Sequence, residues 1–236
     1  MKASLYLIPT TLGDLNTSSE VLPDFNHDIS HKISIFIVEQ IRTARRFLKK
    51  INHPVPIDDM VFYELNKHTD LNKVSSYLNA ITNNNQSIGL LSEAGTPCVA
   101  DPGSLIVKLA HEKNIEVVPL VGPNSIILSL MASGFNGQNF SFHGYLPVDK
   151  SQRQKKIIEL ENDAIRKNQT QIFIETPYRN MQVFENLIKH CKKKTLICIA
   201  CNISLNNQYI KTHTVEQWGK EKVDLHKKPT VFLLYK

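Results

Sequence analysis

The sequence predicts an α/β protein in which a mostly parallel sheet is covered by helices. Three observations favour this class. Apolar, β-branched runs alternate with helical periods along most of the chain, the run "ISIFIVE" (33–39) is almost continuously apolar, and a break at 119–125 separates two such patterns. A continuous run of this kind is typical of a strand buried on both faces. The alternation of strands and helices then indicates a sheet with helical crossovers.

The first half of the chain alternates strands with helices. The helix after the second strand has a basic face, and the next helix begins with Thr69 or Asp70 as its cap. We expect strands at 4–9, 33–39, 58–65, 87–93 and 115–121, and helices at 42–52, 69–82 and 104–114.

A second pattern follows "PLVGPNS" (119–125), in which two prolines and a glycine interrupt the chain after a strand. The sequence therefore predicts an N-terminal α/β domain over 1–118 and a C-terminal α/β domain over 119–236. In the second domain we expect helices at 125–135, 151–168 and 179–191, and strands at 139–146, 170–176, 195–201 and 230–236.

Charge is distributed unevenly between the two halves. Residues 1–116 hold 11 Lys+Arg against 13 Asp+Glu, a net charge of −2, whereas residues 117–236 hold 17 against 9, a net charge of +8. The positive charge of the second half is what binding to a polyanionic partner requires. The alternative is that surface lysines only keep the protein in solution, which explains the same count equally well.

Composition also excludes several classes of protein. The apolar stretch at the N-terminus is too short for a signal peptide, and no apolar run reaches the length of a membrane span. The four cysteines have no disulfide-framework spacing, which indicates a reducing compartment and hence a cytoplasmic protein. The nine histidines show no metal-ligand spacing, so no catalytic metal is expected.

Three loops that each follow a strand have unusual chemistry. They are "PTTLGDL" (9–15), "EAGTPCVADPG" (93–103) and "VGPNS" (121–125), each with glycine or proline and small hydroxyl side chains. Ligands in open α/β sheets bind at the carboxyl ends of the strands, so the loops predict a small-molecule pocket. Neither G-x-G-x-x-G nor the P-loop pattern is present, so the residues alone do not identify the ligand.

These loops carry a family resemblance. "LYLIPTTLGDL", "LLSEAGTPCVADPGS", "VVPLVGPNSIILSLMASG", "FSFHGYLP" and "FIETPYRN" resemble, in this order, motifs of the tetrapyrrole methylase superfamily, and most closely those of its small-subunit rRNA 2′-O-ribose methyltransferase I branch. The resemblance spans nearly the whole chain. It implies two α/β domains with S-adenosylmethionine (SAM) bound in the cleft between them, a homodimer, and structured RNA of the small ribosomal subunit as the partner.

The resemblance also assigns roles to individual positions. Arg42 and Arg179 match positions implied to contact the substrate. The positions implied to bind SAM are Pro9, Leu12, Thr96, Val99, Ser125, Ile126, Thr176 and Thr230.

Glu39 is the candidate catalytic residue, because it ends a buried strand at the carboxyl edge. The alternative is an ion pair between Glu39 and Arg42 or Arg45 on the following helix. Glu93 and Asp101 can bind the cofactor, but the loop chemistry favours a role in which they accept backbone N–H groups and shape the loop.

The sequence departs from the family pattern in two blocks. Gln40 replaces an acid, and Cys201 and Asn202 occupy positions where the rRNA branch has Arg and Glu. Two other functions therefore stay open: a methyltransferase that acts on a tetrapyrrole or another small molecule, and a non-catalytic relative that binds SAM or RNA.

Overall fold

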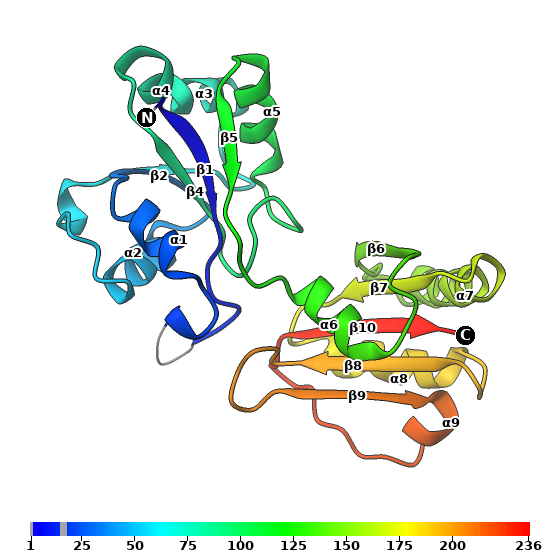
Figure 1. Ribbon diagram of the computed structural model, residues 1–236. Coiled ribbons are helices and arrows are strands. Elements are labelled where there is room, and N and C mark those ends of the chain that lie inside the picture. Colours follow the sequence, from blue (N-terminus) through cyan, green and yellow to red (C-terminus); the bar gives the residue numbers. More distant parts are fainter. Residues whose placement is uncertain (1, 15–17) are drawn as a thin grey trace. The chain divides into compact units, whose positions relative to one another are not determined.

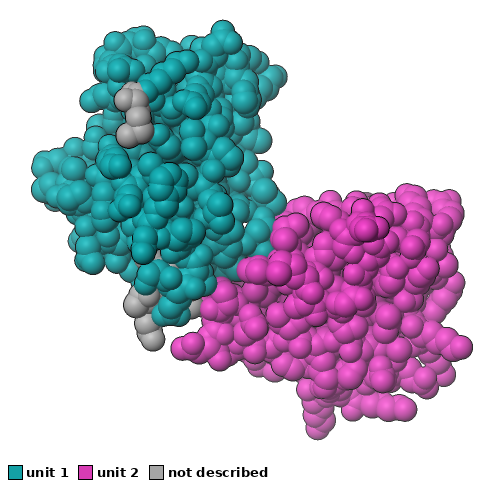
Figure 2. All heavy atoms as spheres, viewed as in Figure 1, with its two compact units in different colours: residues 1–124 teal, residues 125–236 magenta. Residues whose placement is uncertain are grey.

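A computed structural model describes residues 2–14 and 18–236. Leu15, the last residue of the first predicted loop, lies outside the described residues. The chain divides into two compact units, unit 1 over residues 1–124 and unit 2 over residues 125–236 (Figure 2). The boundary predicted from the sequence, after residue 118, lies slightly earlier, within the last strand of unit 1.

The described part of unit 1 contains a five-stranded sheet in the order β3-β2-β4-β1-β5 (Figure 1). Every neighbouring pair is parallel, so the expected parallel sheet is confirmed for this unit. Its strands are β1 (Ser4–Ile8), β2 (Ile35–Val38), β3 (Val61–Glu64), β4 (Ile88–Leu91) and β5 (Glu116–Pro119).

Helices cover both faces of this sheet, which explains why β2 is buried along its whole length. One core contains α1 (Asp24–Ser30) and α2 (Ile41–Lys50), and the other contains α3 (Leu71–Val74), α4 (Asn79–Asn84) and α5 (Ser104–Glu112). Short 3-10 turns lie at Ser18–Glu20 (η1), Ile57–Asp59 (η2) and Ser75–Leu78 (η3).

Asp70 caps α3, because its carboxylate accepts a hydrogen bond from the backbone N–H of Asn72 at 3.0 Å. This confirms one of the two caps expected from the sequence. The single helix expected over 69–82 is wrong, since η3 separates α3 from α4.

Unit 2 contains a mixed sheet in the order β6-β7-β10-β8-β9. Only β6 and β7 are parallel; β10 runs antiparallel to both of its neighbours, and β9 runs antiparallel to β8. The strands are β6 (Phe140–Tyr145), β7 (Thr170–Ile174), β8 (Leu196–Cys201), β9 (Tyr209–Thr214) and β10 (Thr230–Tyr235).

Four helices accompany the sheet of unit 2. In Figure 1, α6 (Ser125–Ser133) lies in front of the sheet, and α7 (Lys150–Lys167) and α8 (Asn180–His190) lie behind it. The core behind the sheet packs α7 and α8 against Phe173, Phe232 and Trp218, the last from the short helix α9 (Val215–Trp218). Among the described residues of the chain, none of the helices combines the length and apolar character that a membrane span requires.

Candidate functional site

The first two predicted loops meet at the carboxyl edge of the unit 1 sheet. Thr10, after β1, donates its backbone N–H to the carbonyl oxygen of Gly95, after β4, at 2.9 Å. The Thr10 hydroxyl lies 3.2 Å from the hydroxyl of Ser92, and both side chains are buried. These bonds fix the first loop against the second.

Gly95 is the point at which all three loops come together. A Cβ atom at this position would lie 2.8 Å from Leu12 Cδ2 in the first loop and 2.8 Å from the Pro123 carbonyl oxygen in the third. The φ of Gly95 is 73°, a left-handed conformation that glycine adopts without steric cost. The close approach of the loops therefore requires glycine here.

The second loop has an unusual backbone over its next residues. Cys98 and Ala100 have φ values of 68° and 58°, which are uncommon for residues with a side chain. The Asp101 carboxylate stabilises this course, because it accepts the backbone N–H of Gly103 at 3.1 Å and those of Cys98 and Glu93. The interpretation of Asp101 as a loop-shaping residue is confirmed.

Glu93 also shapes the backbone, because its carboxylate accepts the N–H of Gln40 at 3.1 Å. This hydrogen bond links the loop after β4 to the start of α2. It brings the end of β2, where Glu39 lies, next to the second loop.

Two of the predicted SAM-binding residues lie in the second loop. Thr96 accepts a hydrogen bond from the side-chain amide of Asn124 at 2.6 Å, whereas Val99 is 45% exposed. Pro9 is buried and Leu12 is half-buried in the first loop. The structure thus gathers these four residues at one edge of the sheet.

Glu39 lies half-buried at the end of β2, close to two other carboxylates. Burial, followed by the charges of Asp101 and Glu93, raises the pKa of the Glu39 carboxyl. The expected alternative, an ion pair with an arginine of α2, is absent among the described residues, where Arg45 pairs instead with Asp58 at 3.7 Å. Arg42 is exposed on the same helix.

Replacing Glu39 with glutamine is expected to stabilise the protein slightly at pH 7. A raised pKa means that the folded protein disfavours the ionised carboxylate. The resulting loss of folding free energy is present at neutral pH and disappears as the pH falls below about 4.5, where the carboxyl is protonated in both states. Because the carboxyl is partly exposed, solvent screening keeps the gain below about 1 kcal/mol.

Urea unfolding at pH 7 and pH 4.5 measures this effect, with Glu64→Gln at the end of the neighbouring strand β3 as the control. A gain that is the same at both pH values would contradict the electrostatic origin.

The remaining predicted residues lie in unit 2. Ser125 and the buried Ile126 open α6. Thr176 is exposed after β7, and Thr230 begins β10. Because Val231 of β10 pairs with Ile174 of β7, the two threonines lie at the same edge of this sheet.

Arg179, a predicted substrate contact, is engaged within the protein. Its guanidinium pairs with the fully buried carboxylate of Glu175 and donates to the carbonyl oxygen of Leu146 at 3.2 Å. These partners give Arg179 a structural role, and its contact with substrate stays a prediction.

Two asparagines that the sequence did not single out hold the third loop in place. Asn124 bonds to Thr96, and the buried Asn26 of α1 donates to the Val121 carbonyl oxygen at 2.7 Å. Asn124 follows Gly-Pro in a predicted turn, which is a usable signal, whereas α1 itself was not predicted from the sequence.

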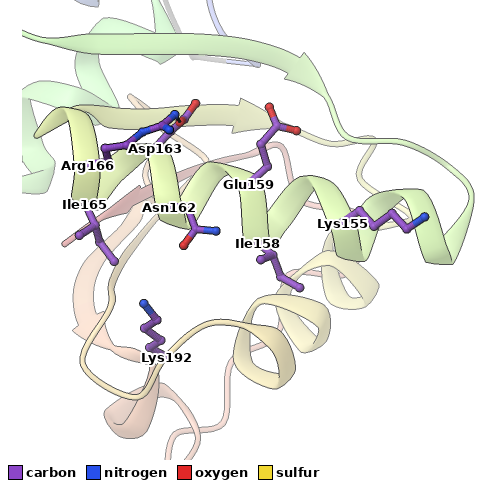
Figure 3. Close-up of a pocket in the computed structure, with 8 residues that line it drawn as sticks. All are labelled: Lys155, Ile158, Glu159, Asn162, Asp163, Ile165, Arg166 and Lys192. Atoms are coloured by element: carbon purple, nitrogen blue, oxygen red, sulfur yellow. Dashed lines mark hydrogen bonds and ion pairs between the residues drawn. The ribbon is translucent and has the colours of Figure 1, made fainter.

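Two cavities lie in unit 2, and the smaller one borders Cys201, which pairs with the predicted site residue Thr230. The larger, of about 670 Å³, lies along the outer side of α7 (Figure 3). Figure 3 shows its apolar residues Ile158 and Ile165 between charged side chains, and Lys192 opposite them. None of the predicted site residues lines this cavity.

The second cavity, of about 310 Å³, is lined by Cys201 and Asn202, where the sequence departs from the family pattern. Asn202 is buried, with a left-handed φ of 50°. Within the described ranges, no group of three or more His, Cys, Asp or Glu side chains is arranged to hold a metal ion.

The fold is shared with methyltransferases of known structure. The structure matches the crystal structure of the methyltransferase CobJ with a TM-score of 0.64 and 13% identity, over 99% of this chain and 94% of the other. It also matches uroporphyrin-III C-methyltransferase from Thermus thermophilus, complexed with S-adenosylhomocysteine, with a TM-score of 0.57 and 14% identity, over 99% and 98%. The architecture is therefore that of the tetrapyrrole methylases.

The sequence relatives are more specific. The chain is 30% identical to Ribosomal RNA small subunit methyltransferase I of Vibrio cholerae over 78% of this chain and 59% of the relative. It is 27% identical to the protein of the same name from Buchnera aphidicola subsp. Schizaphis graminum, over 98% and 77%. No family model matches the sequence. The chain thus has the tetrapyrrole methylase fold and is related to the Ribosomal RNA small subunit methyltransferase I proteins, and the family resemblance is confirmed.

Proposed function

We propose that this protein is a SAM-dependent methyltransferase that methylates a ribose 2′-hydroxyl of small-subunit rRNA. The observation that carries the proposal is the relationship to the rRNA small subunit methyltransferase I proteins, which extends over 98% of this chain for the Buchnera relative. The chain spans 59% of the Vibrio relative and 77% of the Buchnera relative, so the activity of the longer proteins is inferred for this chain.

The chemistry of the unit 1 edge fits SAM. The cofactor carries a sulfonium cation, and Glu39, Glu93 and Asp101 place three carboxylates at this edge. Exposed backbone in the glycine- and proline-containing loops offers carbonyl oxygens to the same cation. In this proposal the cofactor is bound by the residues that the family resemblance implies, which are Pro9, Leu12, Thr96, Val99, Ser125, Ile126, Thr176 and Thr230.

SAM supplies an activated methyl group, so the chain has to position the acceptor and remove its proton. Glu39 is the proposed proton acceptor, because its raised pKa makes it a stronger base than an ordinary carboxylate. SAM would supply the methyl group and leave as S-adenosylhomocysteine when the bond between its sulfur and the methyl carbon breaks. The Glu39 carboxylate would accept the proton of the ribose hydroxyl whose oxygen gains the methyl group. The exposed guanidinium of Arg42 is suited to an RNA phosphate.

The proposal extends to the cellular location and the oligomeric state of the protein. We place the protein in the cytoplasm as a homodimer, in line with the family resemblance and with four free cysteines. The net charge of +8 over 117–236 is consistent with a polyanionic acceptor.

Calorimetry with SAM, followed by transfer of its labelled methyl group to purified small ribosomal subunits, tests the proposal. We expect SAM binding and incorporation into RNA, and a loss of incorporation of at least about 100-fold in Glu39→Gln. Incorporation into a tetrapyrrole but not into RNA would support the small-molecule alternative, which the fold neighbours motivate. SAM binding without turnover would support the non-catalytic alternative, which the change at Cys201 and Asn202 motivates.

A further inference from the structure

Two tyrosines are exposed at one edge of the unit 2 sheet. Tyr145, the last residue of β6, is 59% exposed, and Tyr178, in the loop after β7, is 73% exposed. Since β6 and β7 are parallel and Tyr145 pairs with Ile174, both aromatic side chains lie at the carboxyl ends of adjacent strands. Exposed aromatic rings at a shared edge have an energetic cost in water that a ligand can relieve.

The backbone around Tyr145 is shaped for this position. The β6–β7 ladder is irregular between Phe142 and Tyr145, where Gly144 has a φ of 64°. A bulge of this kind changes the direction in which the following side chain points. The presentation of Tyr145 is therefore built into the strand.

Two arginines hold the loop that follows. Arg153, which is 1% exposed, donates from Nη1 to the carbonyl oxygens of Pro147 at 3.2 Å and Val148 at 2.7 Å. Arg179 donates to the carbonyl oxygen of Leu146, and its own position is fixed by Glu175. The residue after Tyr145, Leu146, is thus hydrogen-bonded to the residue after Tyr178, Arg179. This hydrogen bond fixes the backbone beside one tyrosine relative to the backbone beside the other.

The side chains of Lys227 and His226 lie beside Tyr178. The ammonium of Lys227 lies 5.9 Å from the centre of the Tyr178 ring, and the His226 ring meets it edge-on at 6.3 Å. The Lys227 backbone donates to the Pro177 carbonyl oxygen at 3.0 Å and has a φ of 58°. Lys227 is exposed, and Asp224, three residues before it, pairs with Lys228 at 3.0 Å, so the Lys227 ammonium is accessible to a ligand.

The geometry points to a stacking platform: we infer that Tyr145 and Tyr178 stack against unpaired bases of the RNA substrate while Lys227 contacts a phosphate. Aromatic faces beside a cation are the combination that binds single-stranded nucleic acid, because every base has a π-face and every linkage has a negative charge. A duplex keeps its bases stacked inside and offers only the backbone. This inference rests on the proposed RNA substrate.

Binding of a fluorescein-labelled, single-stranded RNA of mixed sequence, about 12 nucleotides long, tests the platform when it is followed by anisotropy. We expect Tyr178→Ala to weaken binding roughly five- to 100-fold and Tyr145→Ala to weaken it within the same range, whereas Tyr178→Phe keeps most of the affinity. The matched control is Phe140→Ala at the opposite end of β6, which is expected to leave binding unchanged. Lys227→Gln should lower the slope of log K against log salt by about 0.7.

Equal losses in Tyr178→Ala and Tyr178→Phe would overturn stacking, as would equally tight binding of a duplex of the same sequence. Unchanged affinity in both alanine variants would also overturn the platform. SAM affinity and methyl transfer, measured on the same samples, separate this inference from the proposed function. If the alanine variants methylate small subunits as the unaltered protein does, only the platform fails; if the unaltered protein transfers no methyl group to RNA, the function fails.

Discussion

Gly95→Ala is expected to destabilise the protein by about 2–4 kcal/mol and to weaken SAM binding by more than about tenfold. About 1 kcal/mol comes from placing a side chain at a left-handed φ of 73°. The rest comes from overpacking, because the new Cβ would lie 2.8 Å from both Leu12 Cδ2 and the Pro123 carbonyl oxygen. The atom contacted in Pro123 belongs to the backbone, so it cannot move aside as a flexible side chain can. The loops therefore have to separate, and Thr96 and Val99 move with them.

Urea unfolding and calorimetric titration with SAM measure the two effects. Gly134→Ala is the matched control, because Gly134 has a similar φ of 76° but no heavy atom lies within 4 Å of the place that its Cβ would occupy. We expect this control to lose about 1 kcal/mol and no SAM affinity. Normal SAM affinity in Gly95→Ala, despite the loss of stability, would show that the three-loop junction does not form the cofactor site.

Arg179→Ala is expected to destabilise unit 2 by about 3–5 kcal/mol. The substitution leaves the carboxylate of Glu175 buried without a counter-charge, and removing one partner of a buried pair costs this amount. It also frees the Leu146 carbonyl oxygen. The loss of unfolding free energy comes from contacts within the protein, so we expect it whether or not RNA is present.

Chemical denaturation of the RNA-free protein tests this effect. Arg166→Ala is the control, because the Arg166 side chain is 75% exposed and its partner Asp163, at 2.8 Å, keeps a second ion pair with Lys167. The removal of Arg166 should cost less than about 1 kcal/mol. The double variant Glu175→Gln, Arg179→Met should recover much of the stability, since it removes both charges. A fully stable Arg179→Ala with weakened RNA binding would instead support the substrate contact predicted from the sequence.

Unit 1 was predictable from the sequence because its strands are continuous apolar runs. The run over 33–39, for example, is almost continuously apolar and contains β2 (Ile35–Val38), which is buried along its whole length. No such signal exists for β9, where "YIKTHT" contains two apolar residues followed by four polar ones and every residue is only half-buried. The antiparallel pairing of unit 2 was missed for that reason and because β10 takes a position between β7 and β8.

The site was predictable in composition but not in its contacts. Loop chemistry indicated that Asp101 binds backbone N–H groups, because short acidic side chains do this locally. The effect of Asp101 and Glu93 on the pKa of Glu39 depends on two loops that lie far apart in the sequence. The engagement of Arg179 by Leu146 is equally non-local, so a motif match alone assigned that arginine to the substrate.

Mapping of ribose methylation across small-subunit rRNA, in strains with and without this gene, tests the central claim most directly. The account predicts that one ribose 2′-O-methyl group is absent from the deletion strain and returns with the intact gene, but not with Glu39→Gln. A deletion strain with an unchanged methylation map would contradict the assignment of small-subunit rRNA as the substrate.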